Sequence, residues 1–300
     1  MTQDRSVHAV ESNGARLYVE SAGSGPELVL VSGGGGDAAM YEHVVPLLTD
    51  HFTVITFDRR GNSRSEFTES DADIAIETQA EDVVAILDAY RIDRALVFGN
   101  SSGAIITVEL IAHHGERVRA AIAHEPPLVQ LLAANDPARQ EITHIHQLAV
   151  DSGPMRGFAA FGAMTAPNLP AALRSRAGQA ALAAASSAAL AVAPVLRAVT
   201  GRPPSPMMRM LGNTDLLMRR ELPDFFDYQP DLAALRTTSV PWRPAVGHAS
   251  VGRPYFVATE ALATALETPC VEFPGGHTAY QTHPGEFAQQ LVQTFAELTR

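Results

Sequence analysis

Short apolar runs alternate along the chain with segments of helical periodicity. The runs are mostly apolar throughout rather than alternately apolar and polar, which is typical of parallel strands buried on both faces of a sheet. We predict six such strands, at Glu27–Val31, Phe52–Phe57, Ala95–Phe98, Ala120–Ala123, Arg243–Val246 and Cys270–Phe273. A further segment, Arg16–Ser21, is predicted to add an antiparallel strand at one edge of this sheet.

The segments between these strands predict helices with an apolar face. They are Ala38–Leu48, Ala75–Tyr90, Ser102–His114, Pro254–Leu266 and Glu286–Leu298. Alternation of strand and helix is typical of an open α/β sheet that carries helices on both faces.

The alternation stops between about Pro126 and Thr238. This stretch holds six of the eight methionines of the chain and several phenylalanines. We predict a helical cap at residues 126–238, inserted into a core formed by residues 1–125 and 239–300. Adaptable methionines over a pocket favour an apolar ligand, although each of these side chains could equally serve only to pack the cap onto the core.

Length and charge restrict the class of protein. With 300 residues, 46% of them hydrophobic, the chain can form one large core with an insertion. The net charge of −11 argues against nucleic acid or an anionic membrane as partner, because both need a basic face. The single cysteine, Cys270, excludes an internal disulfide, and the start MTQDRSVHAV shows no signal peptide. We therefore expect a cytoplasmic protein.

The most apolar window of the chain is Gln179–Val199, which consists mostly of alanine. It also contains Ser186, Ser187, Pro194 and Arg197, and alanine contributes little transfer free energy to membrane insertion. We expect this window to form a helix packed against protein rather than one that crosses a membrane.

The sequence GNSSG at Gly99–Gly103 lies where a predicted strand meets a predicted helix. A nucleophile on such a sharp turn needs small neighbours, and Gly99 and Gly103 stand two residues before and after Ser101. The helix N-terminus that follows favours developing negative charge. Ser102 has no glycine two residues before it, so we predict Ser101 as the nucleophile. An ordinary glycine turn with an N-cap serine is the alternative.

Three more motifs each follow a predicted strand: SGGGGD at Ser32–Asp37, DRRGNSRS at Asp58–Ser65 and PGGHTAY at Pro274–Tyr280. Together with GNSSG, and in this order, they resemble the α/β-hydrolase superfamily in its cap-bearing branch. The resemblance implies an α/β-hydrolase fold, a mostly parallel central sheet flanked by helices, with the cap inserted after the sixth strand of that fold, here Ala120–Ala123.

The resemblance also implies roles for individual residues. Ser101 would be the nucleophile and His277 the general base, while the backbone N–H groups of Gly34 and Ser102 would form the oxyanion hole. It implies no cofactor and no metal. The chain departs from the family in one respect, because Ser32 and Gly33 stand where the first loop usually begins with histidine and glycine.

The carboxylate of a catalytic triad is missing from its usual place. In the resembled fold it follows the seventh strand, but this chain reads VGHASVGR at Val246–Arg253. Glu125, at the end of the sixth strand and 24 residues after Ser101, could replace it, as in certain haloalkane dehalogenases that the chain resembles here. Two alternatives remain. In the first, Glu125 only stabilises the chain where it enters the cap, beside Pro126 and Pro127. In the second, no carboxylate takes part, and Ser250 or a water orients His277.

These residues predict a cofactor-free serine hydrolase that cleaves a small apolar carboxylic ester or lactone through an acyl-enzyme on Ser101. A carbon–carbon bond hydrolase, a non-hydrolytic enzyme on the same fold, and a ligand-binding receptor with little turnover are the alternatives. Epoxide hydrolase and dehalogenase chemistry is disfavoured, because those relatives use an aspartate nucleophile. His144 and His146 form a pair without a plausible third ligand, so we do not expect zinc.

Overall fold

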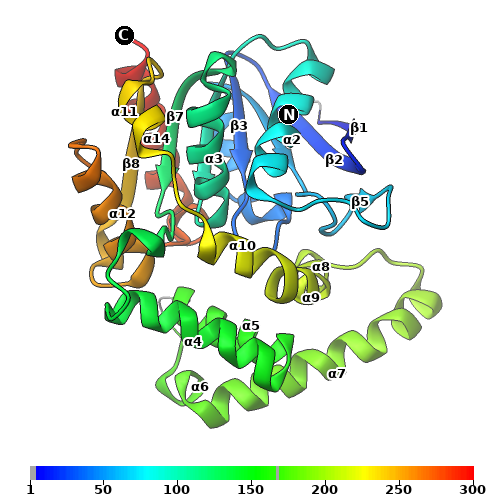
Figure 1. The fold of residues 1–300 in the computed structure, drawn as a ribbon. Coiled ribbons are helices and arrows are strands. Elements are labelled where there is room, and N and C mark those ends of the chain that lie inside the picture. The colour runs from blue at the N-terminus through cyan, green and yellow to red at the C-terminus, as the bar shows by residue number, and fades with distance from the viewer. Residues whose placement is uncertain (1–4, 167–168) are drawn as a thin grey trace.

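The computed structural model describes residues 5–166 and 169–300. Within them, nine strands form a single sheet in the order β1-β2-β4-β3-β6-β7-β8-β9, with β5 paired to β2 (Figure 1). The strands are β1 Ser6–Ser12, β2 Ala15–Gly23, β3 Glu27–Val31, β4 Thr53–Phe57, β5 Glu66–Phe67, β6 Ala95–Asn100, β7 Val118–His124, β8 Trp242–Gly247 and β9 Val271–Phe273. The sheet is parallel from β4 to β9 and antiparallel around β2.

Helices cover both faces of the sheet, and a second group of helices lies across one end of it (Figure 1). The helices of the core are η1 Ala38–Tyr41, α1 Val45–Leu48, α2 Ile76–Tyr90, α3 Ser102–His113, η2 Gly115–Arg117, η5 His248–Ser250, α12 Pro254–Ala265, α13 Ala279–Thr282 and α14 Pro284–Leu298. Between β7 and β8 lie η3 Val129–Leu131, α4 Pro137–Ser152, α5 Pro154–Thr165, α6 Ala171–Arg174, α7 Arg176–Thr200, α8 Pro206–Gly212, α9 Thr214–Leu216, η4 Leu217–Glu221, α10 Leu222–Asp227 and α11 Leu232–Thr237.

The apolar strands are buried on both faces. In β3, Val29 and Val31 belong to the core under α2 and α3, whereas Leu28 and Leu30 belong to the core under α14. Side chains of a strand alternate between the two faces, so a strand covered by helices on both sides has no polar position. This explains why the predicted strands read as continuous apolar runs.

The structure confirms the α/β-hydrolase fold, corrects two predicted elements and adds an edge strand, β1. The helix expected at Ala38–Leu48 is divided into η1 and α1, because Pro46 has no N–H for a helical bond and fits only a first helical turn. Arg16–Ser21 is antiparallel as predicted but does not form the edge, since β1 pairs outside it with Ser6 opposite Ser21. Strand β1 was not predicted, because most of its residues are exposed.

The prediction that the alanine-rich helix packs against protein is wrong for most of its surface. Within α7, Ala183 is the one fully buried residue, and 6% of its most apolar 18-residue window is buried. By length and hydropathy alone, α7 is the one helix among the described residues that could cross a membrane.

A buried ion pair fastens the cap to the core. Arg59, which follows β4, donates to Glu221 of η4 at 2.6 Å, and both side chains are 1% exposed or less. The same guanidinium donates to Gln79 of α2 and to the carbonyl of Gly33. The pair therefore ties the cap, the sheet and the glycine-rich loop to one another.

We expect Glu221→Ala to lower the free energy of unfolding by about 3–5 kcal/mol, because the buried Arg59 charge loses its partner. Urea denaturation measures the effect. Asp215→Ala is the matched control, since Asp215 pairs with Arg219 in the same segment but is 73% exposed, and its loss should cost less than about 1 kcal/mol. Equal effects of the two changes would contradict the structural role of the buried pair.

Candidate active site

Ser101 lies on the sharp turn between β6 and α3. Its backbone adopts φ 57° and ψ −125°, in the left-handed half of backbone space that non-glycine residues rarely occupy. Its N–H donates to the carbonyl of His124 at 2.9 Å, which fixes the turn against β7. A Cβ atom on Gly99 would collide with the carbonyl of Gly103, and one on Gly103 would collide with the carbonyl of Val31. Glycine is therefore required on both sides of the turn.

The structure brings Glu125 and His277 together. Nδ1 of His277 lies 2.7 Å from Oε2 of Glu125, and both side chains are almost completely buried. The other carboxylate oxygen, Oε1, accepts a hydrogen bond of 2.8 Å from the N–H of Gly247. A carboxylate bound to Nδ1 favours the tautomer with the proton on that atom, which leaves Nε2 able to accept a proton.

The residues at the usual acid position have other contacts. Ser250 is buried in η5, and the described residues include no hydrogen bond between it and His277. His248 accepts a hydrogen bond from the N–H of Gly275 and so supports the loop before His277. Of the three sequence interpretations, the geometry matches the one in which Glu125 partners His277, and its catalytic role remains a prediction.

Burial and charge compete at this site. Burial acts to raise the pKa of the Glu125 carboxyl, but its electrostatic interactions with His124 and His277 and the hydrogen bond from His277 outweigh this effect and hold the pKa below its usual value. Burial lowers the pKa of His124 to about 4. At neutral pH the site therefore holds an ionised carboxylate beside an uncharged His124.

A polar network of Asn100, His124 and Tyr280, which the sequence did not indicate, supports the site. The amide of Asn100 donates to the carbonyl of His277 at 3.1 Å and contacts Nδ1 of His124 at 3.0 Å. Tyr280 donates to the Asn100 amide oxygen at 3.1 Å. Asn100 lies inside GNSSG, directly before Ser101, and Tyr280 lies inside PGGHTAY, so their places in these motifs were the available signal.

Tyr255 of α12 was also not predicted as part of the site. Its ring stacks on the His277 imidazole, with centroids 3.8 Å apart and planes inclined by 25°. Nothing in the local sequence of α12 connects Tyr255 with a loop more than twenty residues later. The stacking restricts rotation of the imidazole and leaves its edge nitrogens available.

Ser101 opens onto a small apolar cavity under the cap. The cavity measures about 30 Å³, and Gly34, Ser102 and Tyr255 line it together with Ser101. The remaining lining comes from Pro127, Ile142, Ile145, Phe161, Met164, Leu217, Leu222, Phe225 and Phe226. Of the six cap methionines, Met164 lines this cavity among the described residues, whereas Met218 packs inside the cap and Met207 is exposed.

The predicted oxyanion-hole donors lie at this cavity. Gly34 and Ser102 both border it, and no backbone hydrogen bond engages the N–H of either among residues 5–166 and 169–300. Ser102 is the first residue of α3, where helix geometry leaves the N–H without an intrahelical acceptor. Both groups are therefore free to donate to a ligand.

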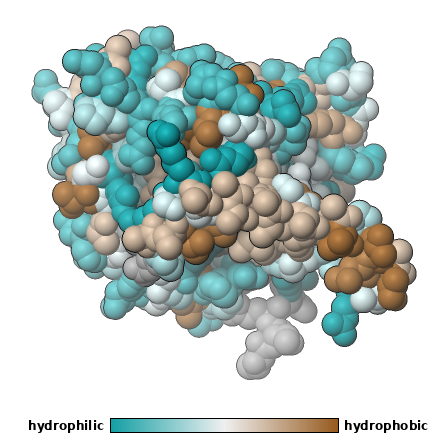
Figure 2. Space-filling view, turned by 90° about the horizontal axis from the view of Figure 1, so that it is seen from below, coloured by the Kyte–Doolittle hydropathy of each residue, from teal (hydrophilic) through white to brown (hydrophobic). Residues whose placement is uncertain are grey.

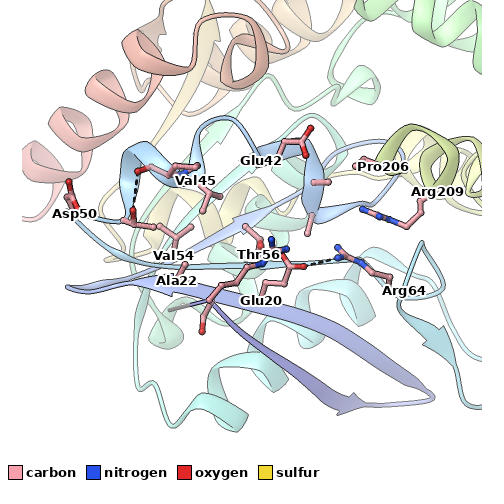
Figure 3. A pocket seen from close by; sticks show the side chains of 16 residues that line it. Glu20, Ala22, Glu42, Val45, Asp50, Val54, Thr56, Arg64, Pro206 and Arg209 are labelled. Carbon is pink, nitrogen blue, oxygen red and sulfur yellow. Dashed lines mark hydrogen bonds and ion pairs between the residues drawn. The ribbon is translucent and has the colours of Figure 1, made fainter. Parts of the chain in front are cut away.

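A larger cavity of about 590 Å³ lies elsewhere, between β2, β4, η1 and α8 (Figure 3). Its arginines are already paired: Arg5 with Glu20, Arg64 with Glu20 and Asp58, and Arg209 with Asp37. None of its lining residues also lines the cavity at Ser101, so its size does not make it the candidate site. Within the described part of the chain no three potential metal ligands cluster, and His144 and His146 lie on α4.

Comparisons with known proteins agree with the fold. A family model described as alpha/beta hydrolase fold matches residues 26–163. The chain is 34% identical over 282 residues to a Bacillus subtilis protein named Uncharacterized hydrolase YraK, covering 93% of this chain and 92% of that protein. Over 118 residues, 38% of this chain and 45% of the relative, it is 38% identical to a zearalenone hydrolase from Bionectria ochroleuca.

Among solved structures, Est816, described as an N-acyl homoserine lactone degrading enzyme, superposes with a TM-score of 0.64. The two sequences are 21% identical, and the superposition covers 96% of this chain and 100% of that one. Fold, motifs and relatives together establish that the chain belongs to the α/β-hydrolase superfamily and is a hydrolase of that fold.

We expect His124 to make the stability of the protein sensitive to mild acid. Its pKa is about 4 in the folded protein, against roughly 6.5 for an unperturbed imidazole, so between these values only the unfolded chain binds the proton. The free energy of unfolding therefore falls as the pH drops from about 6.5 towards 4, by up to about 1.4 kcal/mol per pH unit.

His124→Phe removes this titration and keeps an aromatic ring beside Phe98, Phe273 and Phe287. Between about pH 7.5 and about pH 5.5, urea denaturation should show the variant losing about 1 kcal/mol less stability than the wild type. Parallel pH dependence of the two proteins would show that His124 does not titrate as the structure implies.

Proposed function

We propose that the protein is a cofactor-free serine hydrolase that cleaves an apolar carboxylic ester or lactone through an acyl-enzyme on Ser101. The observation that carries this proposal is the buried 2.7 Å contact between Glu125 and His277, beside a strained serine at an apolar cavity. A carboxylate, an imidazole and a hydroxyl in this order are the parts that acyl transfer to serine requires.

The proposed reaction has two halves. Nε2 of His277 takes the Ser101 hydroxyl proton while Oγ attacks the substrate carbonyl, and the N–H groups of Gly34 and Ser102 bind the oxyanion. His277 then returns the proton to the leaving alkoxide, which departs as an alcohol or, from a lactone, as the far end of the acyl chain. A water molecule, deprotonated by His277, attacks the acyl-enzyme and releases the acid as Ser101 regains its proton.

The apolar lining supports the substrate class. By their names, one relative of the chain acts on zearalenone, and a protein of similar fold acts on N-acyl homoserine lactones. A cavity of about 30 Å³ holds roughly one water, whereas ligand pockets measure roughly 300–1,000 Å³. Substrate binding therefore displaces cap side chains, and the flexible thioether of Met164 is suited to such a change.

A panel of p-nitrophenyl esters and lactones, together with covalent labelling by a fluorophosphonate, tests the proposal. Ser101→Ala should abolish labelling and reduce kcat by roughly 10⁶-fold, as expected when a triad nucleophile is removed. Ser102→Ala is the matched control and should retain most activity, because only its backbone N–H is used. Labelling of Ser102, or retention of activity without Ser101, would contradict the assignment. Ligand binding without turnover would favour a receptor.

The role of Glu125 has its own test. Glu125→Gln keeps an oxygen acceptor for the N–H of Gly247 but removes the charge beside His277, so acylation should slow by about 10²–10⁴-fold. The rate of fluorophosphonate labelling reports acylation directly, and circular dichroism checks the fold. Ser250→Ala, a neighbouring buried change, should slow acylation far less than Glu125→Gln does. Unchanged kinetics in Glu125→Gln would show that the site works without a carboxylate.

A further inference from the structure

The C-terminal half of α7 forms an arm of the cap with exposed aliphatic side chains. Val192, Val195, Leu196 and Val199 are 57%, 66%, 64% and 80% exposed, and Met207 at the start of α8 is 61% exposed. In Figure 1 the arm extends to the right below the sheet, and in Figure 2 its end appears as a brown patch that continues from a tan, alanine-rich stripe. We call these five residues the cap patch.

One side of α7 is already occupied. Its inner side packs against α5, α6 and α8, and Leu182, Ala183 and Leu190 are buried or half-buried there. No charged residue occurs between Arg176 and Arg197, and Ser187 is the one polar residue among the exposed ones there, so the outer side is mostly apolar as well. A helix that is apolar all round normally lies inside a protein or a membrane, and contiguous exposed apolar surface normally marks an interaction site.

The segment of the sequence that contains the cap patch is opposite in net charge to the rest of the chain. Residues 152–214 contain six arginines, no lysine and no acidic residue. Because the whole chain carries −11 and this segment carries +6, the remainder carries −17. Arg197 and Arg202, which flank the patch, are exposed and form no ion pair within the described part of the chain. The net charge of the whole chain argued against a membrane partner, but the surface at the cap patch is apolar and is flanked by arginines.

We propose that the cap patch docks on the surface of an anionic lipid bilayer. Aliphatic side chains flanked by arginines are the chemistry that binds the interface of such a bilayer, where apolar groups enter the headgroup region and cations stay near the phosphates. Since the inner side of α7 is packed onto the cap, the helix lies on the bilayer and does not span it. This proposal is independent of the chemistry at Ser101.

A second copy of the chain is a less suitable occupant. In a two-fold symmetric pair the same patch faces itself, so the arginines of the basic segment would approach their own counterparts with no acidic residue of that segment between them. An anionic surface instead neutralises Arg197 and Arg202 while it covers the valines.

Co-sedimentation of the full chain with vesicles tests the proposal. We expect binding to phosphatidylcholine vesicles that contain about one-third phosphatidylglycerol, weak binding to pure phosphatidylcholine, and release at high salt, because screening weakens the attraction. Replacing Arg197 and Arg202 by glutamine should weaken binding about 25-fold, since each basic side chain near an anionic surface contributes roughly a factor of five.

A pair of triple variants isolates the apolar contribution. Val192→Ser, Val195→Ser and Val199→Ser together should abolish vesicle binding at unchanged net charge. The matched control replaces three equally exposed valines elsewhere, Val7, Val150 and Val251, which are 52%, 66% and 72% exposed, and should bind as the wild type does. Both variants should keep the wild-type melting temperature, because all six side chains lie on the surface.

Several results would overturn the proposal. The first is that the wild type does not bind anionic vesicles, and the second is that both triple variants lose vesicle binding equally. The third is binding that resists high salt and alkaline carbonate, which would indicate a membrane-spanning helix. A dimer in light scattering that the cap-patch variant dissociates, without any vesicle binding, would assign the patch to a second copy.

Discussion

The architecture of the site depends on one buried carboxylate. Glu125 holds the N–H of Gly247 with one oxygen and Nδ1 of His277 with the other, so a single side chain joins the ends of β7 and β8 and the loop after β9. Its own N–H is bound by the carbonyl of Ala245. A buried charge is tolerated only when its bonds are satisfied, and satisfying them here fixes the three chain segments around the imidazole.

Two strained residues stand side by side at the carboxyl ends of adjacent strands. Ser101 and Glu125 both have positive φ, of 57° and 53°, and the N–H of Ser101 binds the carbonyl of the residue before Glu125. Each such conformation costs on the order of 1–3 kcal/mol and persists only when its surroundings determine it. Here the parallel pairing of β6 with β7 holds both residues in this conformation. It aligns Asn100, which precedes Ser101, with His124, which precedes Glu125.

The sequence was informative where chemistry is local. Ser101 and its flanking glycines, the strands and the core helices follow from short-range patterns, and the structure places them close to the predicted positions. Tyr255 and the Asn100–His124–Tyr280 network could not be predicted, because their contacts join segments remote in sequence. The packing of α7 was mispredicted for a related reason: apolar composition indicates that a helix will be covered, but not by what. The fold is established, whereas the roles of Ser101, His277, Glu125, Gly34 and Ser102 remain predictions.

Placing the acidic side chain at the end of β7 has a consequence for how the protein can vary. The turn after β8, where the resembled fold usually carries its acid, is left here with His248, Ala249 and a 72% exposed Val251. Because no carboxylate of this turn has to reach the imidazole, its exposed tip at Val251 can accept substitutions and insertions, whereas His248 still binds the N–H of Gly275 and supports the loop before His277. Substitutions should therefore be tolerated better at the tip of the β8–α12 turn than at Glu125. Glu125 lies directly before Pro126 and the cap, so a change there affects both the contact with His277 and the start of the cap.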